Sequence, residues 1–102
     1  MYIYNITFNV EECIEHEWKK YVKKIFIPKM LQTGSFQSAL TSKILVEEMQ
    51  GISYSIQFKS KNKEKLHKFI NGKFNEILTE IHQKFSPKMV YFATEMLVID
   101  EQ

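Results

Sequence analysis

The stretch Tyr2-Ile3-Tyr4-Asn5-Ile6-Thr7-Phe8-Asn9-Val10 decides the fold, because apolar and polar residues alternate along most of its length. Its even positions are all apolar or aromatic, whereas Asn5, Thr7 and Asn9 occupy odd positions. A period of two residues is typical of a β-strand with one buried and one wet face. Residues 52–59 repeat the pattern, with Ile52, Tyr54, Ile56 and Phe58 alternating with Ser53, Ser55, Gln57 and Lys59. The sequence therefore predicts two half-buried strands.

After the first strand the spacing of apolar residues becomes helical. They recur every three or four positions over residues 14–25, and glutamates near the start favour a helix N-terminus. Because the residue before a proline is pushed out of the α region, Pro28 predicts that this helix is interrupted near Phe26. A last short turn over residues 29–32 is then expected, closed by Gly34.

The remaining segments complete the order of elements. A strand is expected over residues 38–48, followed by a turn at Met49-Gln50-Gly51 in which the glycine supplies a positive φ. A second helix is expected to begin after Asn62, a favourable N-cap, and to stop at Pro87. A final strand over residues 88–99 gives the order βαββαβ. We therefore predict one ferredoxin-like α+β domain over residues 1–102, with a four-stranded antiparallel sheet and two helices on one face.

Two helices can cover only one face of such a sheet, so its two faces must differ. The aromatic-rich face is predicted to meet the helices, because the alternative face is small and polar. The last strand is apolar on both sides, so one of its sides must also point away from the helices. A partly apolar, uncovered face predicts a partner, most simply a second copy of the chain in a homodimer.

Composition excludes several classes of protein. With 44% apolar and 25% charged residues in 102, the chain is typical of a globular domain. One cysteine excludes an internal disulfide, and neither a secretory signal nor a membrane-length apolar run is visible, so we expect a cytoplasmic protein without membrane contact. All fourteen basic residues are lysines, which removes the bidentate recognition of phosphates and carboxylates that arginine provides.

Nucleic-acid and metal binding are both disfavoured. RNA-recognition domains share this order of elements but stack bases on aromatics of the open face, whereas Tyr4, Tyr54 and Phe58 belong to the opposite face. Weak nucleic-acid binding through lysines alone stays an alternative. No two of the three histidines have ligand spacing, so we expect no metal. Cys13, in a first helical turn with His16 three residues on, leaves nucleophilic catalysis open, although burial of a free cysteine is the plainer interpretation.

A small-molecule site is the main alternative to an interaction role. A cleft on the open face would be lined by Asn5, Gln57, Tyr91 and Glu95 as hydrogen-bonding groups. A carboxylate half-buried in such a cleft has a raised pKa, as enzymes require, but an outward charge on an edge strand also prevents aggregation. We favour edge protection for Glu95. No residue set indicates a catalytic constellation or a cofactor, so a binding or interaction role is the leading hypothesis.

Several strings together resemble a known family: Tyr4-Asn5-Ile6-Thr7, His16-Glu17-Trp18, residues 27–36 (IPKMLQTGSF) and residues 51–58 (GISYSIQF). They are similar to an uncharacterised bacterial family, domain of unknown function 4286, over nearly the whole chain. The resemblance implies a ferredoxin-like fold of the dimeric α/β-barrel type, with Trp18 anchoring the first helix, Pro28 ending it and Gly34 permitting the turn. It implies no established activity. The histidine that commonly precedes Ile-Pro in the family is replaced here by Phe26.

By analogy at the level of the fold, the resemblance also extends to cofactor-free monooxygenases and haem-degrading enzymes, although fold does not fix function.

Overall fold

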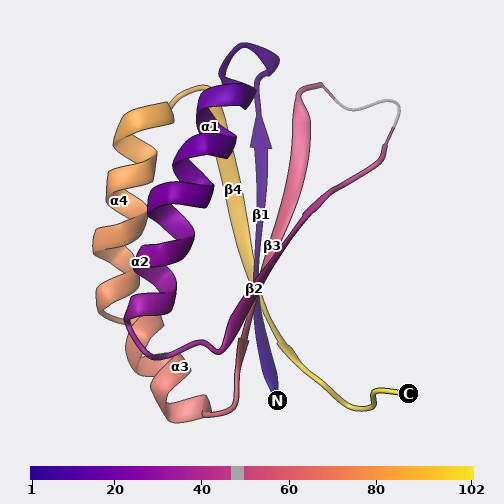
Figure 1. Ribbon diagram of the computed structural model, residues 1–102, viewed down its shortest axis with the longest axis vertical. Helices are drawn as coiled ribbons and strands as arrows, with labels where there is room; N and C mark the ends of the chain where they lie inside the picture. Colours follow the sequence, from indigo (N-terminus) through magenta and orange to yellow (C-terminus); the bar gives the residue numbers. More distant parts are fainter. Residues whose placement is uncertain (47–49) are drawn as a thin grey trace.

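Strand β1 (Tyr2–Val10) runs through the middle of a four-stranded sheet in the order β2-β3-β1-β4 (Figure 1). The computed structural model describes residues 1–46 and 50–102. β1 pairs antiparallel with β3 (Ile52–Ser60) and with β4 (Met89–Leu97), and β2 (Ser38–Lys43) pairs antiparallel with β3. The predicted ferredoxin-like α+β fold is confirmed.

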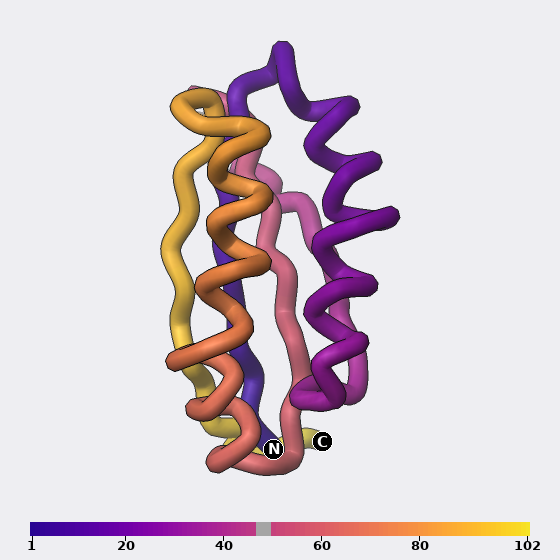
Figure 2. The backbone as a smooth tube through the Cα atoms, turned by 90° about the vertical axis from the view of Figure 1, so that its left-hand side faces the viewer, coloured from indigo at the N-terminus to yellow at the C-terminus, as the bar shows by residue number. Residues whose placement is uncertain are grey.

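The helices all lie on one face of this sheet. They form two stretches, the first made of η1 (Glu12–Ile14), α1 (Glu15–Tyr21), η2 (Val22–Phe26) and α2 (Ile27–Gln32), the second of α3 (Lys63–Ile70) and α4 (Lys73–Phe85). Figures 1 and 2 show both stretches on the same side of the sheet. The face turned away from them is called the open face below.

The core forms between the helices and the aromatic face of the sheet, as the alternation predicts. Ile6, Phe8, Ile56 and Phe58 are fully buried there, and so is Trp18 from α1. The predicted role of Trp18 as the anchor of the first helix is confirmed, because its ring lies 5.3 Å from Phe8, centroid to centroid.

The prediction that Pro28 interrupts the first helix is wrong. The backbone stays helical from Glu15 to Gln32, and Phe26 itself has α-helical angles (φ −63°, ψ −56°). The segment Val22–Phe26 is a π-helical turn, which lets Pro28 fall in the first turn of α2. Pro28 is the second residue of α2, and the Ile27 N–H before it bonds to the Val22 carbonyl oxygen in the π-helical pattern.

The second helical region also differs from the prediction. Asn62 is the N-cap, since its side chain accepts a hydrogen bond from the Lys65 N–H at 3.1 Å. The helix is interrupted at Asn71 and Gly72, so the single helix that the sequence predicts is divided into α3 and α4. A glycine favours such a break because it is the poorest helix former after proline.

Strand β2, the first strand of the hairpin with β3, ends earlier than predicted. β2 ends at Lys43, although the Ile44 N–H still donates to the Ser53 carbonyl oxygen at 2.8 Å. Met49 of the predicted turn, and the last two positions of the predicted strand, lie outside the described residues. Gly51 has the predicted positive φ, 78°, and Gly34 has a φ of 76° after α2.

Candidate functional site

The centre of the open face carries a strip of polar side chains on β1 and β3. Asn5 lies directly opposite Gln57 in the strand register, so both project on the open face as predicted. The Ser55 hydroxyl donates to Asn5 Oδ1, and Asn5 Nδ2 donates to Thr7 Oγ1 at 3.1 Å. Because these groups bond to one another within the chain, the strip loses little hydrogen bonding when a surface covers it.

Exposed apolar side chains flank the polar strip on both edge strands. On β4 they are Val90 and Phe92, each 62% exposed, and on β2 Leu40, 58% exposed. Ile44, Val90 and Phe92 border a groove of about 260 Å³ across one end of the open face. The groove is almost wholly apolar in its lining and thus suits an apolar side chain rather than a polar ligand.

The strand register places Tyr91 and Glu95 on the helix-covered side of β4 and not on the open face as predicted, although Tyr91 also borders the open-face groove beside Val90 and Phe92. In the register with β1, Tyr91 is opposite Phe8 and Glu95 is opposite Tyr4, so both project on the helix-covered face. Glu95 Oε2 is 3.1 Å from His67 Nε2 on α3. Burial, followed by the charges of Glu95 and Tyr91, raises the pKa of Tyr4. Asn5 and Gln57 therefore project on one face of the sheet, and Tyr91 and Glu95 project on the other.

A polar pair missed by the sequence analysis joins α1 to the sheet. The Tyr54 hydroxyl donates to Glu15 Oε2 at 2.6 Å, and Lys43 Nζ lies 3.9 Å from the same oxygen. Burial and this hydrogen bond raise the pKa of Tyr54 to about 12, so the phenol keeps its proton near neutral pH. Such a phenol fastens the helix and is a poor general base. No local pattern marks the pair, because its members are 39 residues apart.

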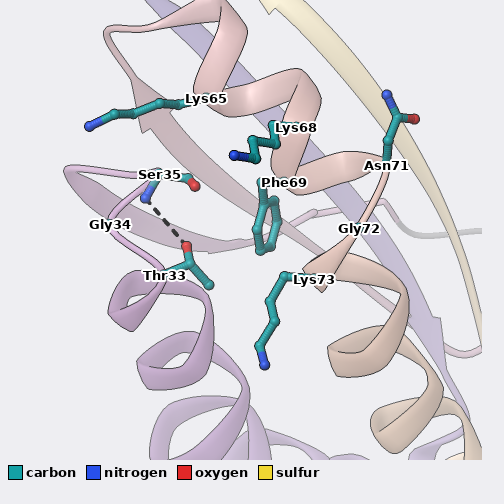
Figure 3. A pocket seen from close by; sticks show the side chains of 9 residues that line it. All are labelled: Thr33, Gly34, Ser35, Lys65, Lys68, Phe69, Asn71, Gly72 and Lys73. Carbon is teal, nitrogen blue, oxygen red and sulfur yellow. Dashed lines mark hydrogen bonds between the residues drawn. The ribbon is translucent and has the colours of Figure 1, made fainter.

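A hollow of about 790 Å³ lies near the junction of α3 and α4, and the loop Thr33–Ser35 lines one side of it. Figure 3 shows the ring of Phe69 pointing into the space between this loop and the junction, surrounded by Lys65, Lys68 and Lys73. The lysines attract anions, but Phe69 is only 4% exposed and offers no ring for base stacking.

Family membership follows from the sequence as a whole. The profile of the family described as "Domain of unknown function (DUF4286)" matches residues 1–99. The chain belongs to the DUF4286 family. Among proteins with curated descriptions, none matches it in sequence.

Solved structures show the same fold at low sequence identity. A dimeric ferredoxin-like protein from an uncultured marine organism is 18% identical, with a TM-score of 0.66 and coverage of 100% of this chain and 98% of that one. A variant of SnoaB, a cofactor-independent oxygenase from Streptomyces nogalater, is 8% identical, with a TM-score of 0.68 and coverage of 98% and 95%. An ethyl tert-butyl ether degradation (ethd) family protein from Bacillus halodurans is also 8% identical, with a TM-score of 0.68 and coverage of 95% and 100%. These similarities show the fold alone.

The other chemistries that the sequence analysis considered have no assembled site in the described part of this DUF4286 domain. Cys13 lies in η1, the first turn of the first helical stretch as predicted, and is exposed rather than buried. No hydrogen bond joins it to His16 among residues 1–46 and 50–102. Those residues also contain no group of three His, Cys, Asp or Glu side chains placed to hold a metal ion. None of the helices described is long and apolar enough to cross a bilayer.

Proposed function

We propose that this DUF4286 domain acts as a homodimeric interaction module in which two open faces pack together. The observation that carries the proposal is the pairing of exposed apolar rims with a polar centre in which Asn5, Thr7 and Ser55 are already hydrogen-bonded to one another. Val90, Phe92 and Leu40 supply the apolar surface. Burial of such a face gains the hydrophobic contribution without leaving these three polar side chains unpaired.

The size of the face and the structural relatives support the same arrangement. A standard interface buries about 800 Å² per partner, a modest part of the 6865 Å² of accessible surface of the chain. A two-fold axis would place the same rims on both partners, so that each groove beside Phe92 receives apolar side chains of the other copy. Two of the solved structures with this fold are described as dimeric ferredoxin-like proteins.

The alternative of a small-molecule enzyme at the predicted cleft has less support. Its four residues divide between the two faces of the sheet, so no single substrate contacts Asn5, Gln57, Tyr91 and Glu95 together. Oxygenases with this fold make a ligand site elsewhere in the domain worth testing, but no catalytic group is assigned by that likeness. A free thiol at Cys13 suits a reducing compartment, and we propose that the dimer lies in the cytosol and that residues 1–102 form one domain.

Sedimentation equilibrium of the unmodified protein at tens of micromolar tests the proposal, and a dimer is expected. Phe92→Glu should weaken the dimer by at least about 100-fold, because it places an unpaired charge in the interface. Leu97→Glu is the matched control: Leu97 is on the same strand and 56% exposed, but it projects on the helix-covered face.

Three results would refute the proposal: a monomeric unmodified protein, a Phe92→Glu variant that stays dimeric, or equal effects of the two substitutions. Gln57→Lys provides a second open-face charge if circular dichroism shows that the Phe92 variant is not folded.

A further inference from the structure

The two ends of the open face differ in shape. At the end where β2 turns toward β3, Ile44, Val90 and Phe92 border the apolar groove of about 260 Å³. Leu45, the next residue along the chain from Ile44, is 87% exposed and adds to the apolar surface at this end. This end of the face is therefore hollow and apolar.

An apolar side chain projects from the opposite end. The chain leaves the sheet after Leu97, where the Val98 N–H donates to the Met1 carbonyl oxygen at 3.0 Å. Figure 1 shows residues 98–102, in yellow, running out on the side of the sheet away from the helices. Ile99 is 86% exposed, so its own chain covers almost none of it. Within the part of the chain that the structure describes, Leu45 and Ile99 are the most exposed large apolar residues.

The flat part of the sheet is small for a stable dimer. Strands β1, β3 and β4 have nine residues each and β2 has six. At about 3.3 Å per residue and about 4.8 Å between strands, the sheet fills a rectangle no larger than about 30 by 19 Å, or about 570 Å². A standard interface buries about 800 Å² per partner, so segments beyond the flat sheet are expected to contribute. The centre of the face adds little hydrophobic free energy, because Asn5, Ser55 and Gln57 are polar.

Two-fold symmetry allows two ways of packing these faces. With the axis parallel to the strands, each end of one copy meets the same end of the other, so groove faces groove. With the axis perpendicular to the strands and between the two sheets, each end meets the opposite end. Residues 98–102 of each copy then lie over the groove of the other, and Ile99 is buried twice in the dimer. This second arrangement covers the projecting side chain and fills the groove with the same contact.

We propose that Ile99 of each copy inserts into the apolar groove beside Val90 and Phe92 of the other, with the strand directions of the two sheets reversed about a perpendicular two-fold axis. The inference rests on the proposed dimer, and it adds which segment of the second copy fills the groove and which axis relates the copies.

Disulfide trapping tests the contact directly. In a Cys13→Ser background, which removes the single native thiol, Val90→Cys and Ile99→Cys are combined. The two new thiols of one chain cannot join, because the strand from residue 90 to residue 97 spans about 23 Å and a disulfide requires Cα atoms within about 7 Å. The double variant should therefore form a covalent dimer on mild oxidation at tens of micromolar, as seen on a non-reducing gel. Each single-cysteine variant is a matched control and should stay unlinked, because identical positions lie at opposite ends of the dimer.

Sedimentation equilibrium of two serine variants gives a second measurement. Ile99→Ser should weaken the dimer by at least about tenfold, because two buried isoleucine side chains are lost from each dimer. Leu97→Ser is the matched control, since Leu97 is 56% exposed and only two residues away but projects on the helix-covered face. It should change the dimer affinity by less than about threefold.

The outcomes distinguish this inference from the proposed dimer itself. A monomeric unmodified protein overturns both. If the unmodified protein is a dimer, three results overturn the inference alone: no covalent dimer from the double-cysteine variant, equal linking by a single-cysteine variant, or equal dimer affinity of the Ile99→Ser and Leu97→Ser variants. Linking confined to the double variant, together with a dimer weakened by Ile99→Ser and not by Leu97→Ser, supports the contact.

Discussion

Replacement of Trp18 by alanine tests how the first helical stretch packs against the sheet. Trp18 is fully buried, and its ring contacts the rings of Phe8 and Tyr54. Truncation of a buried tryptophan to alanine costs about 3–5 kcal/mol of folding free energy. Removal of the unpartnered indole N–H offsets part of that loss, since an unsatisfied buried donor is itself destabilising by about 1–3 kcal/mol. We therefore expect a loss near the lower end, about 3 kcal/mol.

This loss should be measured by urea denaturation followed by far-ultraviolet circular dichroism, because the variant lacks the only tryptophan and thus its fluorescence. The protein concentration must be held constant, since the midpoint of a dimer depends on it. A loss of about 3 kcal/mol corresponds to a fall in melting temperature of about 12–24 °C for a domain of this size. His16→Ala, an exposed position on the same helix, should change stability by less than about 0.5 kcal/mol. An unchanged midpoint for Trp18→Ala, or equal effects of the two substitutions, would falsify the packing described.

Two further predictions concern the contact between α1 and the sheet and the turn before β3. The hydrogen bond from Tyr54, with the charges of Lys19 and Lys43, lowers the pKa of Glu15. The Glu15 carboxylate therefore contributes its full stabilisation above the ordinary pKa of 4.5, and this contribution is lost as the pH falls through the lower pKa of the folded state. Tyr54→Phe should thus lose less stability than the unmodified protein between about pH 5 and pH 3 in urea titrations, and parallel curves would count against the contact. Gly51→Ala should cost at least about 1 kcal/mol more than Gly34→Ala. Both glycines have positive φ, but an added Cβ at Gly51 would lie 2.8 Å from the Val10 carbonyl oxygen. At Gly34 an added Cβ would have no atom of the described residues within 4 Å beyond its chain neighbours. Equal losses of stability for the two variants in thermal denaturation would contradict this difference.

The local sequence pattern was sufficient to predict the order of the strands and helical regions and the buried face of the central strands β1 and β3. The alternation in Tyr2–Val10 and Ile52–Ser60 identified both the strands and the face that meets the helices, because the side of a strand residue depends on its immediate neighbours. Asn62 was identified as an N-cap for the same reason, since its hydrogen bond to Lys65 spans three residues. Asn5 and Gln57 were correctly assigned to the open face.

Features that depend on contacts distant in sequence were settled by the tertiary structure. β4 carries apolar residues on both of its sides, so either side could face the helices and bury apolar residues. Only the register of β4 with β1 shows that Tyr91 and Glu95 project on the helix-covered face. Helix continuity through Pro28 depends on the π-helical turn before it, which sequence rules for proline do not anticipate. Sequence alone therefore determined the order of the strands and helices and the buried face of β1 and β3. The breaks within the helices and the composition of the open face arise only when packing brings separate elements together.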